Sequence, residues 1–295
     1  MTEYTVGARN AEVVDAAGGE TIRLLAMYPS HAPEAPVAMG PYTLDVAMGA
    51  PIAEGRFPLV VHSHGTGSSH LLCRTVTSRL ARHGYVVVML EHPRNNRNDN
   101  ALAGTATILA NRPRHVRVVL DWAFGAEGFG ASLVPDSAAV MGHSLGGYTA
   151  LALAGGTPTS FPNESPDGRE HPVPVAQDPR VKALVLLAPA TPWFKAPGAL
   201  SSVRVPVLMF TGEQDGHAPA WFGQIVERGL PSPNRLTHVV VPKAGHYSFL
   251  SPFPASMVSP TFSPSQDPPG FDRAAFHERL GSDVQAFLDR ELPRG

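Results

Sequence analysis

The sequence predicts an α/β fold in which a mainly parallel central sheet carries helices on both faces. From residue 58 onward, short apolar runs alternate with segments of helical pattern, as in sheets whose strands are covered on both sides. Ahead of these, residues 4–14 and 21–28 have the pattern of an antiparallel strand pair. The chain has 295 residues, 43% of them apolar, and α/β folds commonly form one domain at such a length. We therefore expect a single domain spanning residues 1–295.

The expected elements follow one another in the order that this fold requires. The apolar runs predict strands at 59–61, 85–90, 138–141, 181–187, 205–210 and 236–241. Helices are predicted at 69–83, 111–124, 144–154, 219–228 and 273–290. The second helix opens near Pro113, because proline fits a first helical turn, where its missing N–H needs no partner. Ligands bind outside the carboxyl ends of parallel strands, so we expect the chemistry directly after residues 61, 90, 141, 210 and 241.

The composition excludes several classes of function. The formal net charge is -2 and no basic run occurs, so nucleic acid and anionic membrane surfaces are not expected partners. No apolar stretch approaches the roughly 18 residues of a membrane span, and the N-terminus lacks a signal-peptide pattern. The single cysteine, Cys73, cannot form an internal disulfide. We expect a cytoplasmic protein without metal or cofactor, and the sequence does not determine its oligomeric state.

A glycine-flanked serine follows one of the predicted strands. Gly142, Ser144 and Gly146 form the pattern G-x-S-x-G between an apolar strand and an apolar helix. In a sharp strand-to-helix turn of this kind the serine hydroxyl is lifted into the site, and glycines on either side avoid clashes. The alternative is an ordinary turn whose serine caps the helix. The pattern and its context together favour Ser144 as a catalytic nucleophile.

A serine nucleophile needs a base, and the base needs an acid that orients it. In enzymes built around this turn, the acid and then the histidine follow the nucleophile along the chain. Asp215, shortly after the strand at 205–210, fits the acid, with Glu213 as a rival and a helix-capping role as the alternative. His246 follows the last strand and fits the base. His143, beside the nucleophile, is expected to pack beneath the turn.

Acyl transfer also needs N–H donors for the oxygen that becomes negative. The backbone N–H of Leu145, the residue after the nucleophile, is one candidate. The second is the N–H of Thr66, in the loop after the strand at 59–61. Gly65 and Gly67 would shape this loop and allow the backbone to approach the substrate closely.

Two histidines in the same loop allow a different chemistry. His62 and His64 have an H-x-H spacing that can bind zinc, and a zinc-bound hydroxide can hydrolyse esters. No Asp or Glu lies nearby in the sequence to complete the ligands, and Ser144 would then have no role. A zinc-dependent hydrolase is therefore kept as an alternative, and His64 is expected to order the loop by hydrogen bonds.

At these residues the chain resembles the α/β-hydrolase superfamily, and more narrowly the bacterial predicted dienelactone hydrolases, relatives of platelet-activating-factor acetylhydrolases. The resemblance covers nearly the whole chain and is carried by segments such as Ser63-His64-Gly65-Thr66-Gly67, Gly142-His143-Ser144-Leu145-Gly146-Gly147 and Gly245-His246-Tyr247-Ser248-Phe249. It implies a Ser–Asp–His hydrolase and supports Thr66 and Leu145 as oxyanion donors. Dienelactone hydrolases proper use a cysteine nucleophile, whereas this turn carries Ser144, so the resemblance does not imply a dienelactone substrate.

The polar segment at 91–100 follows the carboxyl end of a predicted strand. Arg94 or Arg97 in it could contact a polar or acidic substrate, although a solvated loop fits the same pattern. His70 is expected either to reach the pocket or to start its helix.

Two long connections are candidates for shaping specificity. In the segment 251–271, Phe253 and Phe262 are expected either to wall an acyl pocket or to anchor the loop to the core. The segment 155–178 is long enough for a small cap over the site but too short for a lid domain.

Together these residues predict a serine hydrolase that cleaves a small-molecule ester or lactone through an acyl-enzyme intermediate. An acyltransferase or cyclase would use the same triad with an alcohol or amine in place of water. A non-catalytic binding protein on this fold would not need the complete triad.

Overall fold

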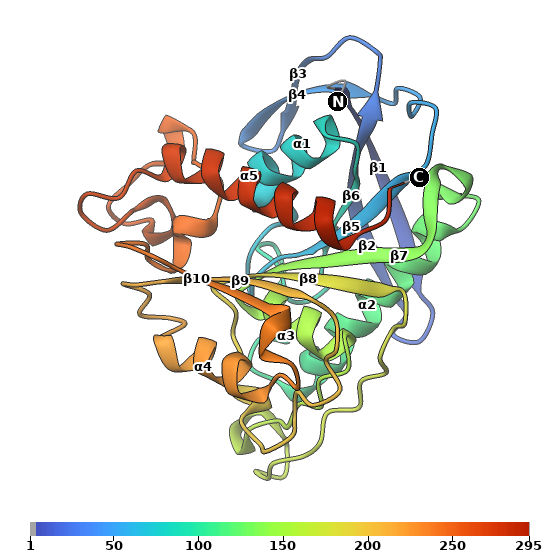
Figure 1. Ribbon diagram of the computed structural model, residues 1–295. Helices are drawn as coiled ribbons and strands as arrows, with labels where there is room; N and C mark the ends of the chain where they lie inside the picture. Colours follow the sequence, from blue (N-terminus) through green and yellow to red (C-terminus); the bar gives the residue numbers. More distant parts are fainter. Residues whose placement is uncertain (1–3, 295) are drawn as a thin grey trace.

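The computed structural model describes residues 4–294, and these residues form a ten-stranded sheet in the order β10-β9-β8-β7-β5-β6-β2-β1-β4-β3 (Figure 1). The strands are β1 (Thr5–Asp15), β2 (Glu20–Ser30), β3 (Ala35–Met39), β4 (Tyr42–Met48), β5 (Phe57–Ser63), β6 (Val86–Glu91), β7 (Leu133–His143), β8 (Val181–Leu187), β9 (Val207–Gly212) and β10 (Leu236–Val241).

Neighbouring strands from β10 to β6 in this order pair in parallel, which confirms the mainly parallel sheet. Strand β2 then pairs antiparallel with both β6 and β1, as expected for the N-terminal pair. Strands β5 to β8 consist almost entirely of buried residues, because helices cover both of their faces. Their carboxyl ends meet at one edge of the sheet, where the site described below is built.

The edge hairpin of β3 and β4 is absent from the sequence prediction. Strand β4 pairs antiparallel with β3 and in parallel with β1. None of the five residues of β3 is buried, so this edge strand has no apolar run that would reveal it. Strand β4 does alternate between buried and exposed residues, a period of two typical of a strand with one buried face.

The helices lie on both faces of the sheet, with α2, α3 and α4 on one side and α1 and α5 on the other (Figure 1). Their bounds are α1 (Arg74–Arg82), α2 (Ala106–Phe124), α3 (Leu145–Leu153), α4 (Ala220–Gly229) and α5 (Arg273–Glu291). Each group of helices packs its apolar side chains onto the sheet and forms a separate hydrophobic cluster. Among residues 4–294, the structure contains no helix that is both long enough and apolar enough to cross a membrane.

The placement of Pro113 in a first helical turn is wrong, because α2 already begins at Ala106, after its N-cap Thr105. Proline inside a helix removes one backbone donor, so the carbonyl four residues earlier loses its partner. Here that carbonyl belongs to Leu109, and the hydroxyl of Tyr148 on α3 donates to it at 3.1 Å. A tertiary hydrogen bond therefore satisfies the group that the proline leaves free.

The helix predicted at 69–83 is divided into two parts. Residues His70–Cys73 form a 3-10 turn, η1, in which the hydroxyl of Ser69 accepts a hydrogen bond from the N–H of Leu71. The α-helix α1 follows and stops before Gly84, which has a φ of 85° that favours glycine.

Candidate active site

The serine turn has the strained geometry of a nucleophile elbow. Ser144 lies between β7 and α3 with a φ of 53° and a ψ of -118°, which is costly for any residue except glycine. The neighbouring glycines allow this close turn: a Cβ on Gly142 would lie 2.1 Å from the carbonyl oxygen of Gly146. A Cβ on Gly146 would lie 1.9 Å from the carbonyl oxygen of Ser63 on β5. Both positions therefore require glycine for the turn to form.

Asp215 and His246 meet across two loops at the carboxyl end of the sheet. Oδ2 of Asp215, after β9, lies 2.9 Å from Nδ1 of His246, after β10, and both side chains are buried. The other carboxylate oxygen of Asp215 accepts hydrogen bonds from the backbone N–H groups of His217 and Ala218 at 2.8 and 2.7 Å. The carboxylate is thus fixed, and a proton on Nδ1 leaves Nε2 of His246 as the basic nitrogen.

Glu213, the alternative acid, lies away from His246. Oε2 of Glu213 accepts a hydrogen bond from the backbone N–H of Lys243 at 2.8 Å on the protein surface. Of the two carboxylates considered from the sequence, the structure brings Asp215 to His246 and leaves Glu213 outside.

His143 lies against His246 rather than simply beneath the turn. Its Nε2 is 3.1 Å from the carbonyl oxygen of His246, and the two rings are 4.9 Å apart. Burial, together with the nearby His246, lowers the pKa of His143 well below its usual value. A neutral His143 therefore supports the backbone of His246 without adding a charge beside it.

The loop after β5 passes directly over the serine. A Cβ on Gly65 would lie 3.3 Å from Cβ of Ser144. Gly65, Thr66 and Gly67 all line the cavity that contains Ser144. Leu145 begins α3 immediately after the serine, so its N–H belongs to the first turn of that helix. The structure therefore places Thr66 and Leu145 beside Ser144, and their roles as two donors and a nucleophile stay predictions.

Sequence reasoning missed the buried arginine that holds this loop. Arg112 on α2 is fully buried and donates to the carbonyl oxygen of His64. It also donates to Oδ1 of Asn95 at 2.5 Å and to Oγ1 of Thr149 on α3 at 3.1 Å. Burial lowers the pKa of the Arg112 guanidinium to about 9. One cation thus connects three segments: residues 64–67 after β5, which we call the oxyanion loop for its predicted role, the loop after β6, and the helix after Ser144.

Asn95 extends this network to Thr66. Its Nδ2 donates to Oγ1 of Thr66 at 2.9 Å and to Oδ1 of Asn100 at 2.7 Å. A signal for Arg112 was present in the sequence: it falls on the same helical face as Ile108 and Val116, four residues away on either side. An arginine on an apolar stripe needs buried acceptors, and here these belong to the oxyanion loop.

The zinc alternative finds no support in the geometry of His64. Its Nδ1 lies 2.6 Å from the carbonyl oxygen of Gly65, and its Nε2 accepts the backbone N–H of His92 at 3.1 Å. Both ring nitrogens are therefore used within the protein, which is the ordering role expected for His64. His62 is fully buried, and burial lowers its pKa to about 3.

A different group of residues has the spacing of metal ligands. The ligand atoms of Asp15, Glu20 and His115 lie within 4.8 Å of one another, at the hairpin between β1 and β2. However, Oδ2 of Asp15, the oxygen that faces His115, accepts a hydrogen bond from Nε of Arg114 at 2.8 Å. The Arg114 guanidinium therefore already neutralises the carboxylate. Nδ1 of His115 is 3.2 Å from Nδ1 of His92. We interpret the group as a buried polar cluster that supports the strands beside the oxyanion loop.

A cavity of about 460 Å³ opens in front of Ser144. Its walls combine the oxyanion loop with side chains from the segments after His246. The lining residues are Gly65, Thr66, Gly67, Ser68, Ser69, Leu72, Arg97, His143, Ser144, His217, His246, Tyr247, Leu250, Phe253, Phe262 and Pro264. Phe253 and Phe262 therefore line the cavity, with their rings in an edge-to-face arrangement 5.3 Å apart.

Two predicted substrate contacts lie elsewhere. Arg94 lines a second cavity together with Glu20 and Glu91, and it does not line the cavity of Ser144. His70 starts η1 and lies 3.2 Å from a carboxylate oxygen of Glu91, so its helix-starting role is the one that fits. Arg97 is the arginine of this segment that reaches the Ser144 cavity, because its backbone N–H bonds to the carbonyl of Ser68 at 2.8 Å.

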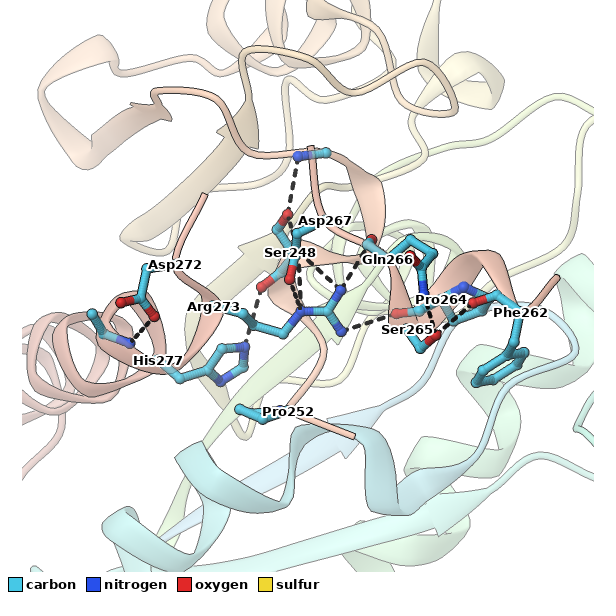
Figure 2. Close-up of polar contacts among 12 residues, drawn as sticks. Ser248, Pro252, Phe262, Pro264, Ser265, Gln266, Asp267, Asp272, Arg273 and His277 are labelled. Carbon is cyan, nitrogen blue, oxygen red and sulfur yellow. Dashed lines mark hydrogen bonds and ion pairs between the residues drawn. The ribbon is translucent and has the colours of Figure 1, made fainter. Parts of the chain in front are cut away.

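Arg273 holds part of the long segment after His246 in place. Figure 2 shows Arg273, at the start of α5, among the polar groups of this segment. Its guanidinium binds Asp267 at 2.9 Å and donates to the carbonyl oxygens of Pro264 and Gln266 at 2.9 and 3.2 Å. Phe262 and Pro264 are thereby fixed as walls of the cavity. The segment 155–178, considered as a cap, instead lines a separate cavity with His171 and Val173.

Comparisons with known proteins agree with this architecture. A family model described as chlorophyllase matches residues 30–161, which include the oxyanion loop and Ser144 but neither Asp215 nor His246. No curated protein sequence matches the chain. The solved structure of a ferulic acid esterase from Streptomyces cinnamoneus is 23% identical, covers 98% of this chain and 90% of its own, and superposes with a TM-score of 0.72. The chain has the α/β-hydrolase fold, as the resemblance implied.

Proposed function

We propose that this α/β-hydrolase-fold protein is a serine hydrolase that cleaves carboxylic esters through an acyl-enzyme intermediate. The chlorophyllase family model and the ferulic acid esterase structure both support a carboxylic ester hydrolase. The observation that carries the proposal is the meeting of Asp215 and His246 at 2.9 Å beside the strained turn of Ser144. That combination matches the acid, base and nucleophile that acyl transfer requires.

In the first step, Nε2 of His246 removes the proton of the Ser144 hydroxyl as Oγ attacks the ester carbonyl. The carbonyl oxygen becomes negative and receives hydrogen bonds from the N–H groups of Leu145 and Thr66. In other enzymes, loss of one such donor costs about 3–4 kcal/mol of transition-state stabilisation. His246 then gives its proton to the leaving alcohol, and the acyl group stays on Ser144.

In the second step, water replaces the alcohol. His246 removes a proton from the water as it attacks the acyl-enzyme, and Ser144 leaves with that proton. The carboxylate of Asp215 stabilises the imidazolium of His246 in both steps. Neutral His143 adds no competing positive charge beside it.

Cys73, the single cysteine of the sequence, is a poor nucleophile. Cys73 is buried at the junction of η1 and α1, and burial raises its pKa to about 12. Because the thiolate is the reactive form, a thiol with this pKa is almost entirely protonated near neutral pH. This supports Ser144 rather than Cys73 as the nucleophile.

A panel of p-nitrophenyl esters of increasing acyl length tests the proposal. We expect release of p-nitrophenolate by the parent protein and by Cys73→Ala, and its loss in Ser144→Ala. Equal activity in Ser144→Ala and the parent, or loss of activity in Cys73→Ala alone, would overturn the assignment.

A further inference from the structure

We propose that the cavity selects esters whose acyl part carries a carboxylate, and that Arg97 binds this carboxylate. The predicted substrates are thus monoesters of dicarboxylic acids. This inference rests on the proposed function, since it names the substrate class of the same site.

The charge of the cavity wall supports this substrate class. Among the described residues that line the cavity, Arg97 carries the only fixed charge, and neither aspartate nor glutamate lines it. The lining contains three histidines: His246 is the base of the proposed reaction, His143 lies against it, and His217 donates its backbone N–H to Asp215. A neutral ester would leave the Arg97 guanidinium without a partner, whereas a carboxylate would pair with it.

A second guanidinium adds to the positive potential around the cavity. Arg74 stacks on the ring of Tyr42 at 4.1 Å and donates to the carbonyl oxygen of Pro252, next to Phe253 in the cavity wall. Burial raises the pKa of Tyr42, and the charges of Arg74 and Arg97 both oppose this rise. Both guanidiniums therefore act on Tyr42, and Arg97 is the one that lines the cavity.

Neither cation is neutralised by the protein. Among residues 4–294, no carboxylate oxygen lies within 4.0 Å of the guanidinium of Arg74 or Arg97. Some arginines of the described residues are paired, such as Arg273 with Asp267 at 2.9 Å, but these two are not. An uncompensated positive site beside a nucleophile attracts anionic substrates and holds them there.

The topology indicates which end of the ester carries the charge. The leaving alcohol must lie near His246, which protonates it, and the chain after His246 supplies Tyr247, Leu250 and Phe253 to the wall. Arg97 is held instead beside the loop that follows β5, because its backbone N–H donates to the carbonyl oxygen of Ser68 at 2.8 Å. The apolar wall therefore suits the alcohol, and the acyl chain runs toward Ser68 and Arg97.

The test compares two esters with the same leaving group, p-nitrophenyl hydrogen adipate and p-nitrophenyl heptanoate. Their acyl chains have similar length, and one ends in a carboxylate. We expect the parent protein to favour the adipate in kcat/KM, with the preference decreasing at high salt because exposed charges are screened. In Arg97→Gln, kcat/KM for the adipate should fall about fivefold while that for the heptanoate stays unchanged.

Arg94→Gln is the matched control, because Arg94 belongs to the same segment but lines the other cavity. It should leave both rates unchanged. Equal use of the two esters by the parent, or an equal loss on both esters in Arg97→Gln, would overturn the inference while leaving a Ser144-dependent esterase intact. If neither ester is cleaved in a Ser144-dependent reaction, the proposed function itself fails. A preference for a carboxylate placed on the alcohol, as in p-carboxyphenyl heptanoate, would contradict the assigned direction.

Discussion

Oδ2 of Asp215 lies 2.9 Å from Nδ1 of His246, and its other oxygen is held by two backbone N–H groups. The carboxylate therefore has one orientation available, and it uses that orientation to fix the imidazole. This contact joins loops that follow two neighbouring strands, β9 and β10, and it leaves Nε2 of His246 as the nitrogen without a carboxylate partner.

The first prediction concerns this pair. Asp215→Asn should lower kcat by roughly 10⁴-fold, because an amide in this position favours the wrong tautomer of the histidine. Glu213→Gln is the control, since Glu213 binds the backbone of Lys243 and does not reach His246. Steady-state kinetics on one p-nitrophenyl ester compares the two variants. A large loss in Glu213→Gln with a small loss in Asp215→Asn would reverse the assignment.

The second prediction concerns the buried cation behind the oxyanion loop. Arg112→Met removes the donors to the His64 carbonyl and to Asn95, so the loop should lose its fixed position. We expect kcat to fall at least about tenfold with little change in KM, because the lost interaction acts in the transition state. Arg117→Met, on the half-exposed side of the same helix, is the control. A change confined to KM would contradict a positioning role for Arg112.

The third prediction concerns the close packing of the elbow. Gly146→Ala places a Cβ 1.9 Å from the backbone carbonyl oxygen of Ser63. The clash can be relieved only by moving the backbone, because no flexible side chain is involved. The free energy of unfolding should fall by about 3 kcal/mol, which lowers Tm by roughly 6–12 °C. Gly216→Ala has open space for its Cβ and should leave Tm nearly unchanged. Equal Tm values for the two variants in calorimetry would show that the turn is less tightly packed than described.

The fourth prediction concerns acid sensitivity. Burial lowers the pKa of His62 to about 3, whereas an unfolded histidine titrates near 6.5. Between these values the unfolded chain binds a proton that the folded chain does not, so stability is complete above pH 6.5 and falls as the pH decreases. At pH 5 this one histidine should cost about 2 kcal/mol.

His62→Leu removes that titration. Urea unfolding at pH 7.5 and pH 5 should therefore show a smaller loss of stability in the variant than in the parent, by about 2 kcal/mol. An identical loss in both proteins would mean that His62 is protonated in the folded state.

The sequence predicted most of the buried strands because their residues are apolar throughout. β8 and β10 have the expected bounds, since Pro and polar residues flank both runs, although only the last residue of β10 is buried. The prediction failed at β3, where an exposed edge strand carries no apolar signal, and at the start of α2. In α2, a tertiary hydrogen bond from Tyr148 compensates for Pro113, and local rules do not reveal such a partner.

Some residues of the candidate site can be predicted from the sequence, and others cannot. Ser144, Asp215 and His246 could be found because each follows a strand and the pattern around the serine is specific. Asn95 and Arg273 could not be found, because their partners lie in loops distant in the sequence. The apolar stripe around Arg112 indicates a buried arginine, but it does not reveal the carbonyl oxygen of His64 as the acceptor. Arg94 and Arg97 were indistinguishable in the sequence, and only the turn of their segment directs Arg97 alone to the Ser144 cavity.

The central claim is that Ser144 is the nucleophile, and covalent labelling with a fluorophosphonate tests it most directly. Intact-mass spectrometry should show one added phosphonyl group on the parent protein, and peptide mapping should locate it on Ser144. Ser144→Ala should gain no mass under the same conditions. An unlabelled parent protein, or a label that persists in Ser144→Ala, would contradict the account.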